Sequence, residues 1–135
     1  MLIHWIWLAT RPELSDRQKI AVLEAFGDPE EIFYGEKAGF SNLTGMTQAA
    51  VEALDDKNLT QAREILDDCV EKGIQICTFH DGAYPARLKN IADPPLVLYY
   101  KGNLTGLDSS PVIGVVGTRK ASAYGLTTSK KMGYQ

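Results

Sequence analysis

Residues 112–125 read VIGVVGTRKASAYG: an apolar run, a glycine turn with two basic residues, and a helix signal. Val112–Val116 is apolar on both faces, which is typical of a buried strand with a neighbouring strand on each side. Gly117 permits a sharp turn, and Ser122 is placed to cap a helix from Ala123 to Met132. The stretch therefore predicts a strand, a turn and a helix. Together with two further predicted strands earlier in the chain, described below, it indicates an α/β fold.

A turn between a strand and a helix gathers backbone N–H groups at the positive end of the helix dipole, and such a place attracts phosphate. Arg119 suits a phosphate because its guanidinium offers two parallel donors, while Lys120 adds positive charge. Thr118 and Ser122 contribute hydroxyl groups. We predict a phosphate-binding site formed by Gly117, Thr118, Arg119, Lys120 and Ser122. The pattern also fits a purely structural turn, because any turn of this kind can contain a glycine and a cation.

The first turn of the predicted helix contains two further candidate residues, Tyr124 and Gly125. Glycine at such a position costs about 1 kcal/mol against alanine, which suggests that a phosphate or a neighbouring strand approaches closely. Tyr124 is either a base-stacking residue, as in proteins that bind single-stranded nucleic acid, or a core aromatic.

Several patterns of cofactor binding and catalysis do not fit this sequence. Gly114-x-x-Gly117 is not the dinucleotide fingerprint, no acidic residue follows to hold a ribose, and the P-loop pattern does not occur. His4 and His80 have no partners at metal-ligand spacing, and no nucleophile elbow is present. We therefore predict no cofactor, no metal ion and no catalytic residue, and hence a protein that is not an enzyme.

Charge is distributed unevenly along the 135 residues. The net charge is -3, yet residues 1–100 contain nine basic against sixteen acidic side chains, while residues 101–135 contain five against one. A basic segment at the end of an acidic chain is where an anionic partner is expected.

Residues 1–72 are predicted to form a helical domain and residues 73–135 to begin an α/β domain. Ser15 with Gln18 makes a capping box, and Gly27 supplies a helix stop. A later helix between Asn58 and Gly73 has an apolar face that consists of Ala62, Ile65, Leu66, Cys69 and Val70. After Gly73 the period changes, and Ile74–Phe79 and Leu96–Tyr100 are predicted strands.

Two features of the first 80 residues have ordinary structural explanations. Cys69 and Cys77 lack the spacing of a metal site or a redox motif, so we expect buried thiols in a reducing compartment, with a disulfide between them as the alternative. Met1–Leu8 is too short to span a bilayer and lacks the features of a signal peptide, so we expect a packed helix or strand and no membrane association.

Three ordered blocks carry a family resemblance. They are Asp81-Gly82-x-Tyr84-Pro85-x-x-Leu88, Ile91-x-Asp93-Pro94-Pro95-x-x-Leu98-Tyr99-x-Lys101-Gly102-Asn103-Leu104, and Val112–Gly117 followed by Thr118-Arg119-Lys120-Ala121-Ser122-x-Tyr124-Gly125. Together they closely resemble the DNA-processing protein A family, also called DprA or Smf. The segment Ala25–Glu30 is similar to that family's N-terminal helical domain.

The resemblance implies a cytoplasmic bacterial protein of natural transformation that binds single-stranded DNA on an extended Rossmann-like domain and helps to load the RecA recombinase. The implied fold is a small helical domain of the SAM or helix-hairpin-helix type, followed by the truncated first part of that Rossmann-like domain. The family's Gly-Ser-Arg phosphate motif maps onto Gly117, Thr118 and Arg119, with Lys120 alongside. The resemblance also implies a homodimer in the full-length protein.

The family's later glycine-rich and basic segments have no counterpart before Gln135. A strand such as Val112–Val116 would then have one open edge and one open face, which favours self-association. We accordingly expect poor packing after about Ser122.

Two other classes of function remain open. Nucleotide phosphoribohydrolases of the Rossmann type also use a glycine-containing phosphate turn, although they need a downstream carboxylate and none follows Asp108. The acidic helical half could instead dock a protein partner. Within it, residues 40–51 resemble a helix-hairpin-helix element with Thr47 where a second glycine is usual, and this hairpin could contact either DNA or a protein.

Overall fold

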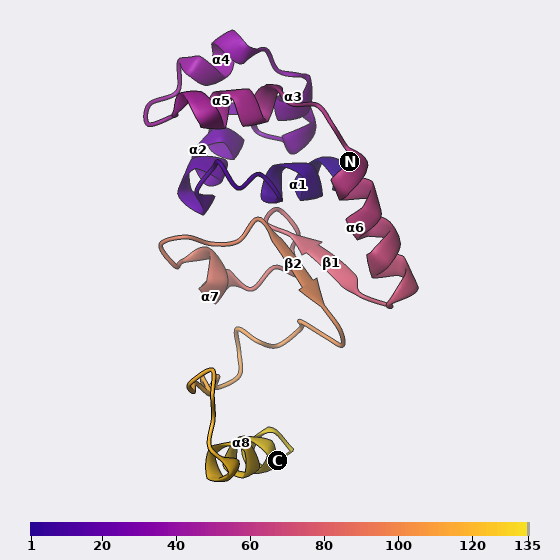
Figure 1. The fold of residues 1–135 in the computed structure, drawn as a ribbon, viewed down its shortest axis with the longest axis vertical. Helices are drawn as coiled ribbons and strands as arrows, with labels where there is room; N and C mark the ends of the chain where they lie inside the picture. Colours follow the sequence, from indigo (N-terminus) through magenta and orange to yellow (C-terminus); the bar gives the residue numbers. More distant parts are fainter. Residues whose placement is uncertain (135) are drawn as a thin grey trace.

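The computed structural model describes residues 1–134. A group of helices precedes a small sheet, and a separate helix lies near the C-terminal end (Figure 1). The elements in chain order are α1 (Leu2–Ala9), α2 (Asp16–Phe26), α3 (Pro29–Tyr34), α4 (Lys37–Ser41), α5 (Gln48–Asp55), α6 (Thr60–Glu71), β1 (Gln75–Thr78), α7 (Ala86–Lys89), β2 (Val97–Tyr100) and α8 (Ala123–Gly133).

Local signals in the sequence set the ends of the early helices. The Ser15 Oγ accepts from the Gln18 N–H at 3.3 Å, and the Gln18 side chain accepts from the Ser15 N–H at 2.9 Å. This is the predicted capping box. Gly27 ends α2 with φ +84°, in the left-handed region that favours glycine. Asp28 then caps α3, with Pro29 at its first position.

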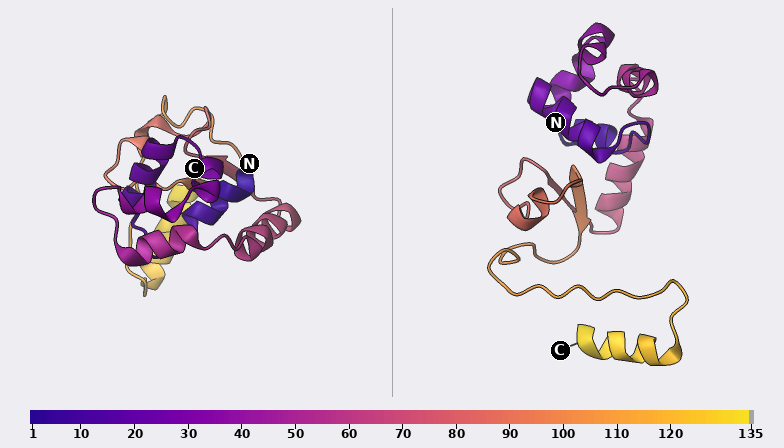
Figure 2. Two further views of the ribbon diagram at one scale, coloured as in Figure 1. Left: turned by 90° about the horizontal axis from the view of Figure 1, so that it is seen from above. Right: turned by 90° about the vertical axis from the view of Figure 1, so that its left-hand side faces the viewer.

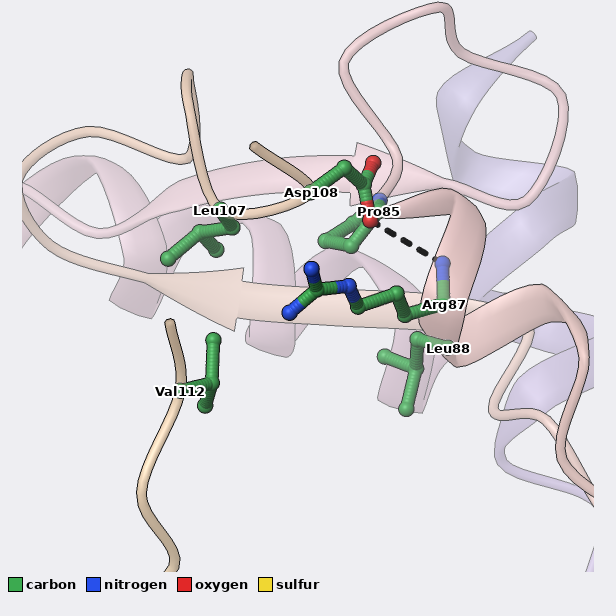
Figure 3. A pocket seen from close by; sticks show the side chains of 6 residues that line it. All are labelled: Pro85, Arg87, Leu88, Leu107, Asp108 and Val112. Carbon is green, nitrogen blue, oxygen red and sulfur yellow. Dashed lines mark hydrogen bonds between the residues drawn. The ribbon is translucent and has the colours of Figure 1, made fainter. Parts of the chain in front are cut away.

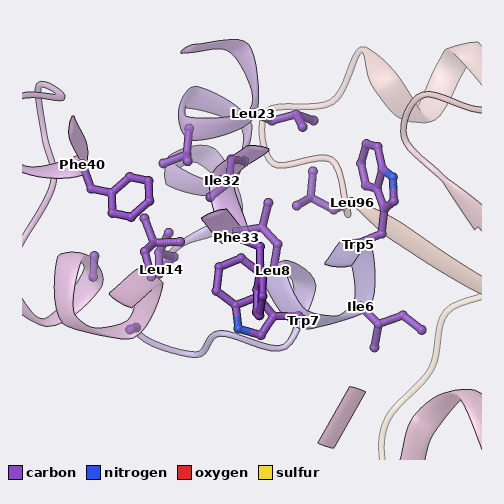
Figure 4. Packing of buried hydrophobic residues seen from close by; sticks show 14 of the residues in the cluster. Trp5, Ile6, Trp7, Leu8, Leu14, Leu23, Ile32, Phe33, Phe40 and Leu96 are labelled. Atoms are coloured by element: carbon purple, nitrogen blue, oxygen red, sulfur yellow. The ribbon is translucent and has the colours of Figure 1, made fainter. Parts of the chain in front are cut away.

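Helix α1 lies at the centre of the hydrophobic core, so the apolar opening segment is a packed helix. Ile6, Trp7 and Leu8 are buried, and the Trp7 ring meets the Phe33 ring edge-on at 5.1 Å (Figure 4). The Trp7 Nε1–H donates to the Asp56 carbonyl at 3.0 Å, so the one polar atom of the indole is satisfied. No helix within residues 1–134 has both the length and the apolar content needed to cross a bilayer.

The predicted apolar face of α6 is only partly buried. Ala62 and Cys69 are buried, and Ile65 and Leu66 are half-buried. The prediction is wrong for Val70, which is 83% exposed. Consecutive helical residues differ in direction by about 100°, so the neighbour of Cys69 turns away from the narrow surface that α6 presents to the core.

The sheet is antiparallel, with Gln75 opposite Tyr100 and Thr78 opposite Val97. Both predicted strands are therefore confirmed. Leu96 and Val97 belong to the same hydrophobic core as the helices, so the sheet is anchored on the helical part. The mixed α and β class is likewise confirmed, whereas the Rossmann-like domain and the boundary between residues 72 and 73 stay predictions.

The predicted strand Val112–Val116 is wrong for the described structure. These residues have no regular secondary structure, and Val116 is 94% exposed. A strand needs hydrogen-bonding partners on a neighbouring strand, and within residues 1–134 no segment pairs with this one. An extended segment instead connects the sheet to α8, which lies apart from the rest of the molecule (Figure 2). None of the residues of α8 is buried, as expected for the part after Ser122.

Candidate functional site

The loop between the two strands is tied down by its own motif residues. The Asp81 carboxylate accepts from the Thr78 N–H at 2.6 Å, and the Asp81 carbonyl accepts from the Tyr84 N–H at 3.0 Å. The buried Tyr84 donates its hydroxyl to the Pro95 carbonyl at 2.7 Å, and burial raises the pKa of this phenol. Lys89 Nζ lies 5.5 Å from the centre of the Tyr84 ring, within cation–π range. These contacts fix the Asp-Gly-x-Tyr-Pro block, which leads directly into α7.

Asp108 joins the next part of the chain to α7. Its Oδ2 accepts from the Ala86 N–H at 2.8 Å and its Oδ1 from the Arg87 N–H at 3.0 Å. In return, Arg87 Nη1 donates to the Ser110 carbonyl at 3.1 Å. The hydrogen bonds from the backbone N–H groups of Arg87 and Ala86 lower the pKa of Asp108.

A mainly apolar cavity of about 300 Å³ lies beside this contact (Figure 3). Its lining residues are Pro85, Arg87, Leu88, Leu107, Asp108 and Val112. The Arg87 side chain extends along it, between the loop that carries Leu107 and the segment that carries Val112. Val112 is the last residue of the chain that lines the cavity, and Gly117, the first of the candidate phosphate-binding residues, follows it by five positions.

The predicted phosphate-binding residues lie on the surface. Gly117, Thr118, Arg119 and Lys120 are all exposed, and the Thr118 hydroxyl donates to the Lys120 carbonyl at 2.9 Å. None of the ion pairs within residues 1–134 involves Arg119. Over the same part of the chain, the backbone N–H groups of residues 117–121 donate to no protein acceptor. Both the guanidinium and these N–H groups are accessible to an anion.

Ser122 begins α8, as the sequence predicts. Its Oγ accepts from the Gly125 N–H at 3.2 Å, so this hydroxyl is used in capping. A Cβ on Gly125 would meet only the Ser122 Oγ and the Ala121 Cβ, at 3.5 and 3.9 Å. Among described residues, therefore, no other segment requires glycine here. Tyr124 is 81% exposed, so its interpretation as a core aromatic is wrong.

The predicted site residues contact one another only where they are close neighbours in sequence. Thr118 contacts Lys120, and Ser122 contacts Gly125, but residues 112–116 do not form the predicted strand that would lead into the turn at Gly117. Sequence reasoning also missed the contact of Asp108 with α7. One signal could have indicated it: Pro85 precedes α7 and has no side-chain acceptor for the first N–H groups of that helix.

Residues 40–51, the segment that resembles a helix-hairpin-helix element, are held by local contacts. α4 and α5 pack together, and Gly45 between them has φ +84°. Thr47 caps α5 by accepting from the Ala50 N–H at 3.1 Å, which accounts for a threonine where a second glycine is usual. The Gly45 carbonyl accepts from Gln18 Nε2 at 2.8 Å, so the hairpin is fastened to α2.

Metal-binding and redox groups do not assemble in the described part of the chain. No cluster of three or more His, Cys, Asp or Glu side chains within residues 1–134 could hold a metal ion. Cys69 and Cys77 are buried free thiols, as predicted.

The amino-acid sequence matches a known protein family. Residues 75–135 match the family model described as DNA recombination-mediator protein A. The chain belongs to the DprA/Smf family. DNA processing protein DprA of Bacillus subtilis is 47% identical over 55 residues, which cover 41% of this chain and 18% of the relative.

Two longer alignments extend into the helical half. Protein Smf of Synechocystis is 30% identical over 118 residues, covering 85% of this chain and 28% of the relative. DNA processing protein DprA of Streptococcus pneumoniae is 30% identical over 140 residues, covering 94% and 43%. The chain thus spans between 18% and 43% of the length of these three DprA/Smf relatives. No solved structure matches it.

Proposed function

We propose that this chain takes part in DNA processing by binding single-stranded DNA through residues 117–122. The observation that supports this most directly is the accessible Arg119, which forms no ion pair within residues 1–134 and stands beside a run of backbone N–H groups that are unbonded in that part of the chain. The matched family model, described as that of a DNA recombination-mediator protein, includes this segment.

A phosphate of the strand would be held by three kinds of group. The N–H groups of residues 117–121 donate to its oxygens, and Arg119 grips two oxygens with its two parallel donors. The N-terminal end of α8, eleven residues long, adds its partial positive charge. Lys120 contributes attraction without fixed geometry. All of these contacts address the backbone, so the binding is independent of base sequence.

The exposed Tyr124 supports a preference for single strands. An unpaired base can stack on an exposed aromatic ring, and such stacking is worth about 1–3 kcal/mol per base. In duplex DNA the bases are already stacked on one another, so the ring would gain much less.

Arg119→Ala tests the proposed site. Titration of a fluorescent oligothymidylate with the 135-residue chain should show about two- to fivefold weaker binding for the variant, since an exposed charge contributes up to about 1 kcal/mol. The slope of log K against log salt should lose about 0.7, the expected value for one phosphate contact on a single strand.

Arg63→Ala is the matched control, because Arg63 is an exposed arginine on α6 in the acidic half. Its affinity and its salt slope should equal those of the unchanged chain. If Arg119→Ala binds with unchanged affinity and unchanged salt slope, the proposal is refuted.

The family resemblance extends the proposal to partners and location. We propose that the longer protein works in the bacterial cytoplasm, forms a homodimer and presents bound DNA to RecA. RecA filament assembly on protein-coated single strands is the measurement that addresses this. A rate that does not depend on the protein would contradict it.

The enzymatic alternative receives no support from the candidate site. A phosphoribohydrolase needs a free carboxylate, and the last carboxylate of the sequence, on Asp108, has both oxygens engaged with backbone N–H groups. Release of free base from nucleotides would be the result that favours the enzyme, and we expect none.

A further inference from the structure

We propose that Asp108 is a positioning residue: by clamping residues 103–110 to α7, it sets the place from which the DNA-contacting segment leaves the folded body. This deepens the proposed function and rests on it. The clamp itself is a property of the protein alone, so it can be tested without DNA.

Asp108 is an acidic residue in an otherwise basic segment. It is the only acidic residue among residues 101–135, which otherwise carry five basic side chains. A carboxylate beside a nucleic-acid-binding segment repels phosphate and would weaken binding. A structural task compensates for that cost, and the structure shows one.

Asp108 completes the start of α7. Pro85 precedes this helix and offers no side-chain acceptor, so the N–H groups of Ala86 and Arg87 need partners from elsewhere. The two oxygens of Asp108 accept one N–H each, at 2.8 and 3.0 Å. Its negative charge also lies next to these donors, which lower its pKa.

The contact is reciprocal and spans 21 to 23 residues of sequence. While Asp108 accepts from the backbone of α7, Arg87 Nη1 donates to the Ser110 carbonyl. Three hydrogen bonds thus join residues 86–87 to residues 108–110. A single bond could rotate as a hinge, whereas three bonds to three different atoms fix an orientation.

The turn that presents Asp108 is itself built for the contact. Gly106 has φ +83°, and its carbonyl accepts from the N–H groups of Ser109 and Ser110 at 3.2 and 3.1 Å. Thr105 N–H donates to the Asn103 side chain at 2.8 Å just before it. The turn is therefore held by its own bonds, and the Asp108 side chain connects it to the body.

Beyond this clamp, no hydrogen bond within residues 1–134 ties the segment to the folded body before α8. Pro111 follows Ser110 directly, and residues 112–117 make no hydrogen bond to another segment within residues 1–134. Gly117 lies seven positions after Ser110, a reach of roughly 23 Å when the chain is extended. Freeing residues 103–110 would lengthen this tether and spread Arg119 over a larger volume, which raises the entropic cost of ordering the segment on DNA.

Hydrogen exchange tests the clamp in the 135-residue chain. In Asp108→Ala, the amides of Ala86 and Arg87 should exchange about tenfold faster, since each loses a charge-assisted hydrogen bond. Asp108→Asn retains one acceptor oxygen, so its exchange rates at these amides should lie between those of the unchanged chain and those of Asp108→Ala. Asp93→Ala is the matched control, because it removes an exposed carboxylate from the loop between α7 and β2 and should leave these amides unchanged.

The sign of the change in DNA affinity distinguishes a positioning role of Asp108 from the simple effect of removing its negative charge. Removing a carboxylate alone favours DNA, so Asp93→Ala should bind the oligothymidylate equally well or more tightly. Asp108→Ala should bind about two- to fivefold more weakly. Unchanged exchange at Ala86 and Arg87 would overturn the clamp. Faster exchange with equal or tighter DNA binding would overturn the positioning role. If the proposed function itself is wrong, the Arg119→Ala variant shows it, because its DNA affinity and salt slope are then unchanged.

Discussion

His4 is a buried titratable residue in the core of an otherwise apolar helix. Its side chain is 1% exposed, its ring stacks on Phe33 at 4.8 Å, and its Nδ1 has no hydrogen-bond partner among residues 1–134. Burial lowers the pKa of His4, and the N-terminal ammonium acts in the same direction. The Glu30 carboxylate, 3.8 Å away, acts against them but does not reverse the shift. His4 is therefore neutral in the folded protein near pH 7.

This pKa shift makes stability depend on pH. The unfolded chain takes up a proton at His4 near pH 6.5, whereas the folded chain does so at lower pH. The stabilising contribution is complete above about pH 6.5 and is lost as the pH falls through the folded pKa. Urea unfolding at pH 7.0 and 5.5 should show lower stability at pH 5.5, and His4→Phe should reduce that loss.

His80 provides the control, since it is the other histidine of the sequence and is exposed. His80→Gln should retain the same loss of stability between the two pH values as the unchanged chain. If His4→Phe also retained it in full, the assignment to His4 would be wrong.

At the scale of elements, the segment Val112–Val116 has strand composition without strand structure. Its side chains are exposed because no neighbouring strand within residues 1–134 offers backbone partners or an apolar surface. Contiguous exposed β-branched residues with free backbone groups favour pairing with another chain. The predicted self-association therefore belongs to this element.

Two lysines in this segment should suppress that association. In Ile113→Lys/Val116→Lys, charge on an unpaired strand opposes edge-to-edge pairing. Sedimentation velocity over a range of concentrations should show an increase in mean sedimentation coefficient for the unchanged chain and a much smaller one for the variant. Lys substitutions at Thr127 and Ser129, which are exposed on α8, are the charge-matched control. Equal concentration dependence in both variants would locate the association elsewhere.

At the scale of the whole molecule, the core runs from the helices into the sheet. Leu96 is 2% exposed and belongs to the same buried cluster as Trp7 and Phe40. The helices and the β1–β2 sheet should consequently unfold together, while α8, which has no buried residue, contributes little to that transition.

Leu96→Ala tests this coupling. Removing a buried leucine side chain should cost about 2–5 kcal/mol. The loss should appear in unfolding followed by tryptophan fluorescence, because Trp5 and Trp7 lie in the helical part. Leu126→Ala on the exposed α8 should leave the transition unchanged. A Leu96→Ala transition equal to that of the unchanged chain would show that sheet and helices unfold independently.

The sequence alone determined the features that depend on neighbouring residues. Ser15 with Gln18, Gly27, Asp28 with Pro29, and Ser122 all mark helix ends correctly, because a cap needs only residues a few positions away. The two paired strands and the basic segment around Arg119 were also predictable, since composition carries them. The family could be inferred as well, because its three blocks are contiguous stretches of the chain.

Tertiary structure decided whatever needs a partner distant in sequence. Val112–Val116 reads as a strand but stays unpaired, since hydrogen bonds between strands come from another segment. Val70 follows the helical period but faces solvent, because the width of the surface beneath α6 is a property of the packed core. Asp108 reads as a surface acid, and only the meeting of residues 86–87 with residues 108–110 makes it a clamp. Local order follows from short-range bonding, whereas a site built from separate segments exists only after the chain has folded.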